Sequence, residues 1–156
     1  MNTSCGVVEM CLKDWVELKR RYSYGWKALK RGSEFGYIGY VTPWQEKEVE
    51  IGTVIKRPTW ANSPDMYVYF FPTKKDVQLY LAMLCYRRCQ IKDEHPAYAK
   101  VKLEGLQYTG TPDTSCGWPS NKPMFVAEKA IVLSISDMPM KSIKARAKWI
   151  KDNRCH

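Results

Sequence analysis

The sequence predicts an α+β fold, a single domain in which a twisted, mainly antiparallel sheet is flanked by one central helix and two terminal helices. The clearest sign is the segment 67–71, five aromatic or β-branched residues without a charge, which is typical of a buried strand. Pro72 ends this strand because proline has no amide hydrogen to donate. Thr73 then stands at a helix N-cap, with Asp76 at the capping-box position. Helices and strands also do not alternate strictly along the chain, which argues against a doubly wound parallel sheet.

Length and composition fit one globular domain spanning residues 1–156. The chain is 45% hydrophobic and 13% aromatic, and its uncharged apolar runs are far shorter than the ~20 residues that span a bilayer. No basic stretch leads into an apolar segment at the N-terminus, so we expect no secretion signal and a protein that is not secreted. The six cysteines are therefore expected to be reduced thiols rather than a disulfide scaffold.

In the first half of the chain, apolar residues recur at three- and four-residue spacing over 7–21 and predict an amphipathic N-terminal helix. Alternation over 24–30 predicts a short strand. The glycines of 36–41 indicate a second, aromatic strand with a bulge or a close backbone approach. A short edge strand is expected at 53–56.

In the second half, the strand at 66–71 leads into a helix at 73–89. Charged residues alternate with apolar ones over 99–104, which predicts a half-buried strand. Glycines and prolines predict a long loop at 108–123, and the apolar segment 125–135 predicts the last strand. Residues 24–136 thus form the predicted α+β core, and a basic C-terminal helix follows at 138–154.

The formal net charge of +9 is concentrated near the two ends of the chain. Residues 13–31 carry seven basic and two acidic residues, and residues 138–156 carry six basic and one acidic, so each segment sums to +5. Two basic regions favour an acidic partner, either nucleic acid or protein.

The predicted C-terminal helix is the main candidate binding surface. An apolar stripe of Ile143, Ala147 and Ile150 leaves its basic residues on the rest of the surface. The alternative is a solvated amphipathic helix whose lysines only maintain solubility. The candidate residues for binding nucleic acid or another acidic partner are Lys141, Lys144, Arg146, Lys148, Lys151 and Arg154.

Three tryptophans in predicted loops form a second candidate surface. Trp44, Trp60 and Trp118 stand in segments that also contain proline or glycine, and exposed aromatic residues of this kind anchor protein–protein interfaces. The alternative is that some of them cover the edges of the core.

No catalytic residue is predicted. Neither a P-loop lysine motif nor Gly-x-Gly-x-x-Gly occurs in the chain. Cys85 and Cys89 share a face of the predicted helix and could form a zinc site with His95 and Cys116. A helical Cys-x-x-x-Cys spacing is a weak zinc pattern, so buried thiols are the preferred interpretation. We therefore expect no metal and no cofactor.

The chain carries three short motifs: Gly25-Trp26-Lys27 in a first strand, residues 69–73 before a helix, and residues 126–135 in a last strand. Together they resemble uncharacterised domains of large DNA viruses and phages, over roughly residues 24–136. These domains have no known activity to carry over. Together with the two basic regions, the resemblance leads us to expect a non-enzymatic viral accessory or virion-associated interaction protein that binds an acidic partner, located in the host cytoplasm or in the virion. A structural minor capsid component is an alternative.

The strand around Tyr69 is also distantly similar to that of ADP-ribosyltransferases, which bind a dinucleotide in a sheet cleft. That similarity implies that Lys27 stands where the enzyme needs histidine and Met124 near where it needs glutamate. Glu128 lies too deep in the last strand to replace the missing glutamate. An ADP-ribosyltransferase-like enzyme is therefore an alternative function. Because the histidine and the glutamate of such an enzyme are both missing, we expect no dinucleotide turnover.

Charge reversal tests the basic C-terminal segment. Changing Lys144, Lys148 and Lys151 to Glu should weaken binding to DNA, RNA or an acidic protein, and the salt slope should fall by about one for each phosphate that is no longer bound. Circular dichroism should show an unchanged fold, because these residues lie off the apolar stripe. Equal polyanion binding by both proteins would show that the basic face is only a solvated surface.

Overall fold

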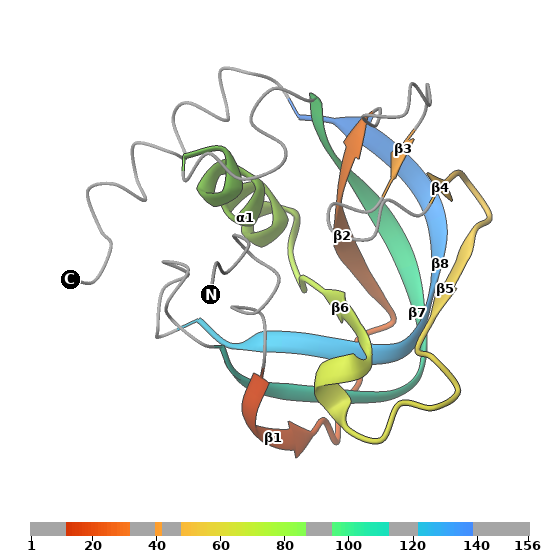
Figure 1. Ribbon diagram of the computed structural model, residues 1–156, viewed down its shortest axis with the longest axis vertical. Coiled ribbons are helices and arrows are strands. Elements are labelled where there is room, and N and C mark those ends of the chain that lie inside the picture. Colours follow the sequence, from red (N-terminus) through yellow and green to blue (C-terminus); the bar gives the residue numbers. More distant parts are fainter. Residues whose placement is uncertain (1–11, 32–39, 42–47, 87–94, 113–121, 139–156) are drawn as a thin grey trace.

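Figure 1 shows the computed structural model, which describes residues 12–31, 40–41, 48–86, 95–112 and 122–138. These residues form a mostly antiparallel sheet with one α-helix, which confirms the predicted α+β class. The elements are β1 (Leu12–Glu17), β2 (Tyr24–Arg31), β3 (Tyr40–Val41), β4 (Glu48–Val49), β5 (Val54–Lys56), the short 3-10 helix η1 (Pro64–Met66), β6 (Val68–Phe70), α1 (Lys74–Tyr86), β7 (His95–Pro112) and β8 (Met124–Asp137).

Two long antiparallel strands, β7 and β8, form the centre of the fold. The sheet runs in the order β4-β3-β2-β7-β8-β5, while β1 pairs with β7 and β6 pairs with β8. Two register shifts interrupt the β7–β8 ladder, one between Lys100 and Val101 and one between Glu104 and Gln107. Figure 1 shows both strands bending sharply together. One half of the bent pair carries β2 and β5, and the other half carries β1 and β6.

The second register shift contains Gly105, whose φ of +84° is the left-handed conformation that glycine adopts without strain. A Cβ at this position would lie 2.8 Å from the Cβ and Oε1 of Glu128. The Glu128 carboxylate occupies that space and accepts a hydrogen bond from Leu106 N at 2.7 Å. The acid therefore binds a backbone amide within the irregular stretch of the ladder.

The bend brings the far ends of the sheet together. Trp26 on β2 and Phe71, which directly follows β6, form an antiparallel bridge. Trp26 N donates to Phe71 O and Phe71 N donates to Trp26 O, both at 2.8 Å. Strands β2, β7, β8 and β6 therefore form a closed ring joined at a narrow seam.

The ring encloses the main hydrophobic core. Its members come from every strand of the ring and from β4, and most are almost fully buried. They are Leu29, Val49, Val68, Phe70, Ala97, Ala99, Val101, Leu103, Phe125, Ala127, Ala130 and Val132. Burial of so many aliphatic and aromatic side chains supplies the main driving force for folding.

Helix α1 packs on β2 and β7 and places Val77 and Leu81, both at 0% exposure, on its inner side. The ring of Tyr80 lies 5.1 Å from that of Phe71, so the helix also contacts the seam. The predicted N-cap is confirmed, since Thr73 Oγ1 accepts a hydrogen bond from Asp76 N at 3.1 Å. The carboxylate of Asp76 binds Lys122 Nζ at 3.1 Å.

The predicted N-terminal helix at 7–21 is wrong over 12–17, where the chain forms strand β1. Asp14 has a φ of +54°, and the pairing with β7 shifts between Lys13 and Val16. This bulge explains the misleading helical spacing, because an extra residue breaks the two-residue alternation of a strand. Trp15 and Val16 are 42% and 62% exposed, so they form no buried helical stripe.

The second terminal helix, predicted at 138–154, lies outside the described residues except for Met138. That residue is buried, and its N donates to Pro96 O at 3.0 Å. The predicted loop at 108–123 is wrong for 108–112, which continue β7. Pairing with β1 on one side and β8 on the other keeps this Gly- and Pro-containing stretch extended. The strands at 24–30 and 53–56 are confirmed, and the central helix predicted at 73–89 is confirmed over 74–86, whereas 87–89 lie outside the described residues.

Gly25 provides a test of the packing inside the ring. A Cβ there would lie 2.7 Å from Phe70 Cδ2 and 3.2 Å from Leu103 Cδ1. Gly25→Ala should therefore destabilise the protein by about 2 kcal/mol in urea unfolding, because the buried side chain of Phe70 must move. Adding Phe70→Leu should make the double variant more stable than the sum of the two single effects implies. Additive effects would mean that this contact is not the cause.

Candidate functional site

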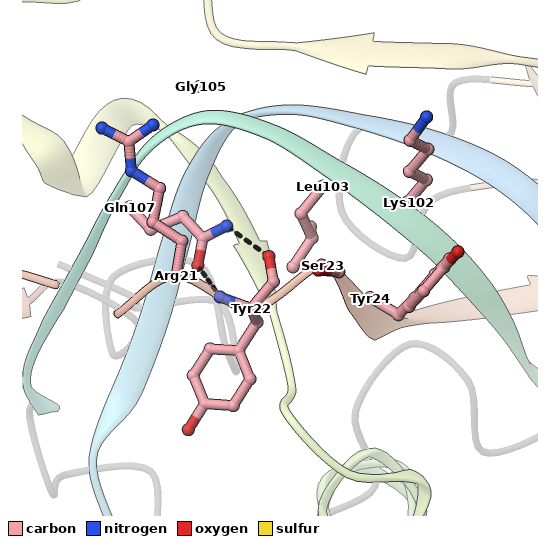
Figure 2. Close-up of a pocket in the computed structure, with 8 residues that line it drawn as sticks. All are labelled: Arg21, Tyr22, Ser23, Tyr24, Lys102, Leu103, Gly105 and Gln107. Carbon is pink, nitrogen blue, oxygen red and sulfur yellow. Dashed lines mark hydrogen bonds between the residues drawn. The ribbon is translucent and has the colours of Figure 1, made fainter. Parts of the chain in front are cut away.

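A hollow opens between the segment that leads into β2 and the bent part of β7 (Figure 2). Its volume is about 370 Å³, which is within the range of small-ligand sites. It is lined by Arg21, Tyr22, Ser23, Tyr24, Lys102, Leu103, Gly105 and Gln107.

The side chain of Gln107 fixes one wall of this hollow. Its Oε1 accepts a hydrogen bond from Tyr22 N at 2.9 Å, and its Nε2 donates to Tyr22 O at 2.7 Å, as the dashed lines in Figure 2 show. Gln107 is only 1% exposed, so both bonds lie in an interior where an unpaired amide would be costly. The amide thus substitutes for a neighbouring strand and holds the backbone between Arg21 and Tyr24.

The ring of Tyr22 packs the same segment against the core, although the residue itself is 38% exposed. It meets Phe70 and Phe125 edge to face, with ring centroids 5.9 Å and 5.5 Å apart. Next to it, Leu103 N donates to Ser23 O at 2.9 Å. The wall of the hollow is therefore held by side-chain, ring and backbone contacts.

Two cations border the hollow. Arg21 and Lys102 are both exposed, and Figure 2 shows their charged ends at opposite margins. Among the described residues, neither forms an ion pair with a carboxylate. The neighbouring acids are already used, because Glu104 binds Lys129 at 3.3 Å and Glu128 binds Arg57 at 3.1 Å. Within the described part of the chain, neither cation is held in an ion pair, although the charge of Arg21 does act on Glu128.

An exposed tyrosine stands beside these cations. Tyr24 pairs with Lys102 across β2 and β7, and Trp26 pairs with Lys100, so the four side chains share one face of the sheet. The Lys100 ammonium lies 5.0 Å from the centroid of the Tyr24 ring. Tyr24 is 48% exposed, which leaves much of its ring open to solvent. We call Arg21, Tyr24, Lys100 and Lys102 the basic aromatic face.

Most residues predicted as binding sites fall outside the described part of the chain. This applies to the six basic residues of 141–154 and to Trp44 and Trp118. Trp60 is described, and it is 70% exposed in the turn that follows β5. The basic aromatic face was not predicted as a site. Its sequence signals were the basic segment 13–31 and the alternating lysines of 99–104.

The positions linked to ADP-ribosyltransferases lie on three different strands. Lys27 on β2 donates a hydrogen bond from Nζ to Tyr69 O on β6 at 3.1 Å, across the seam of the ring. Desolvation by burial lowers the pKa of Lys27 from 10.5 to about 8. Met124 is 1% exposed at the start of β8.

Glu128 is engaged in structural contacts. Its hydrogen bond from Leu106 N is the largest cause that lowers its pKa, and the bond and charge of Arg57 add to this shift against the opposing effect of desolvation. The charge of Arg21 contributes the least. The carboxylate therefore stabilises the fold when ionised, and this contribution disappears as pH falls through its lowered pKa.

The candidate zinc ligands are only partly described. Cys85 lies on α1 and His95 begins β7, whereas Cys89 and Cys116 fall outside the described residues. Within the described ranges, no group of three His, Cys, Asp or Glu side chains could hold a metal ion. Nor does any helix of the described chain have the length and apolarity needed to cross a membrane.

Comparisons with protein-family models, with curated proteins and with solved structures found no match to this chain. The chemistry of the basic aromatic face is therefore the basis for a functional assignment.

The buried amine of Lys27 predicts a specific pH dependence of stability. Below pH 8 both the folded and the unfolded chain carry the proton, and the desolvation cost is fully present. Between about pH 8 and 10.5 the unfolded chain binds more protons, so this group's contribution to folding becomes more favourable as pH rises.

Lys27→Met should therefore be more stable than the wild type near pH 7, by about 1–3 kcal/mol, since the residue is partly exposed and the full shift overstates the cost. The difference should shrink by pH 10 in denaturant unfolding. Lys100→Met, which removes an exposed amine, should show no such trend. A constant difference between Lys27→Met and wild type at all pH values would contradict the assignment.

Proposed function

We propose that this protein is a non-enzymatic binding protein for an acidic, polyanionic partner, which it holds on the basic aromatic face. The observation that carries the proposal is the hollow bordered by Arg21 and Lys102, two exposed cations without a carboxylate partner among the described residues. Structural ion pairs occupy Glu104 and Glu128 instead.

The hollow contains few of the side chains that usually catalyse reactions. Of the described residues that line the hollow, none is a carboxylate, histidine or cysteine, so no thiol nucleophile and no carboxylate or imidazole base faces it. Binding therefore rests on charge and contact area. A chain with a net charge of +9 also attracts polyanions at long range.

The basic segment 138–156 extends this proposal. Its six cations add to the charge available for a long polyanion, which would contact more than one part of the chain. A viral accessory or virion-associated role, with a location in the host cytoplasm or the virion, stays a prediction that rests on the sequence resemblance. So does the alternative of a structural capsid component, for which Trp60 is an exposed candidate contact.

The test compares two charge reversals of equal size. Lys102→Glu places a negative charge at the hollow, whereas Lys75→Glu makes the same change on the exposed side of α1. Lys102→Glu should weaken binding to heparin and to oligo(dT) about tenfold and lower the salt slope by about one. Lys75→Glu should change the affinity less than twofold. Fluorescence anisotropy over a range of salt concentrations measures both quantities.

Equal effects of the two reversals would show that only the net charge matters, and the proposal of a site at the hollow would then be wrong. Both lysines are exposed, so thermal unfolding should confirm that both variants are folded.

A further inference from the structure

We infer that the polyanion is single-stranded nucleic acid, with one base stacked on Tyr24 and the adjoining phosphates held by Arg21 and Lys102. This inference rests on the proposed function and names the class of its partner. The inference depends on the position of the Tyr24 ring beside the cations of the basic aromatic face.

The ring of Tyr24 has two lysines as neighbours on β7. Lys102 is its direct cross-strand neighbour, and Lys100 lies on the diagonal with its ammonium 5.0 Å from the ring centroid. At an exposed site, the attraction between a cation and a tyrosine ring favours this arrangement by about 0.5–1 kcal/mol. An exposed tyrosine held in this way is a preformed surface for stacking, since little conformational entropy is lost when a base binds.

An acidic peptide would need only the cations. A carboxylate is repelled by the negative face of an aromatic ring, so the exposed part of Tyr24 would contribute little to such a complex. A nucleotide uses both parts of the face, because its phosphate binds the cations while its base stacks on the ring. Aromatic side chains beside a positively charged groove are the recurring feature of proteins that bind single strands.

A duplex fits this face less well. Its bases are stacked on one another inside the helix, so a tyrosine on the surface of a sheet meets only the phosphate backbone. A single strand can turn one base out toward the ring.

Little sequence preference is expected in the part of the site that is described. The one amide side chain in the lining, Gln107, uses both its oxygen and its nitrogen on the backbone of Tyr22. It is therefore held away from the edge of a base. Leu103 offers an apolar contact, which does not distinguish the bases.

The experiment measures binding of three probes: oligo(dT), a DNA duplex of equal length, and polyglutamate. Wild type should bind oligo(dT) most tightly. Tyr24→Ala should weaken oligo(dT) binding at least fivefold, the lower end of the stacking contribution, and leave the salt slope unchanged because no charge is removed. The same variant should bind polyglutamate like the wild type. Tyr24→Phe keeps the ring and should bind oligo(dT) within twofold of the wild type, with both variants checked by thermal unfolding.

The outcomes separate the two claims. If Lys102→Glu weakens binding but Tyr24→Ala does not, or if polyglutamate or the duplex binds as tightly as oligo(dT), the partner is not single-stranded nucleic acid and the proposed function stands. If Lys102→Glu has no effect on any probe, both the function and this inference are wrong. A weakening of oligo(dT) binding in Tyr24→Phe equal to that in Tyr24→Ala would also overturn stacking, since the ring is retained.

Discussion

The bend of the β7–β8 pair is the constraint on which the rest of the fold depends. Without a sharp change of direction at Gly105, β2 and β6 would stand at distant ends of a flat sheet. The glycine accepts the left-handed backbone, and the Glu128 carboxylate binds the Leu106 amide beside it. This irregularity bends the sheet, and the bridge between Trp26 and Phe71 closes it into a ring with an enclosed core.

The candidate site is a product of the same bend. Gln107 resumes the pairing with β8 directly after the bulge, and its side chain binds the backbone of Tyr22. The ring of Tyr22 packs against the edge of the core, and Arg21 and Tyr24 beside it are exposed. Charge and aromaticity are therefore displayed on a rigid support. This is the condition under which few contacts can give useful affinity.

The sequence allowed correct predictions where local chemistry decides the structure. The strand that ends at Pro72 and the cap at Thr73 depend on residues next to each other, and both were found. The strand β1 was mistaken for a helix because the bulge at Asp14 imitates helical spacing. The end of β7 was mistaken for a loop because Gly110 and Pro112 are held extended only by distant strands.

The basic aromatic face could not be predicted for a related reason. Tyr24 and Lys102 are far apart in the sequence, and only the register of β2 on β7 places them together. The alternation over 99–104 did predict that its lysines are exposed. The aromatic residue that lies beside these lysines is set by the pairing of β2 with β7, and no local sequence pattern determines that pairing.

The ends of the sheet have a consequence for the protein at high concentration. An exposed strand edge offers unpaired amides and carbonyls to another molecule, and long flat edges promote aggregation. In the described part of the sheet, β4 has two residues and β5 has three, of which Lys56 adds a charge. The longer β1 is interrupted by its bulge at Asp14. Each of these described edges is too short or too irregular to template a second sheet, which disfavours edge-to-edge association at high protein concentration.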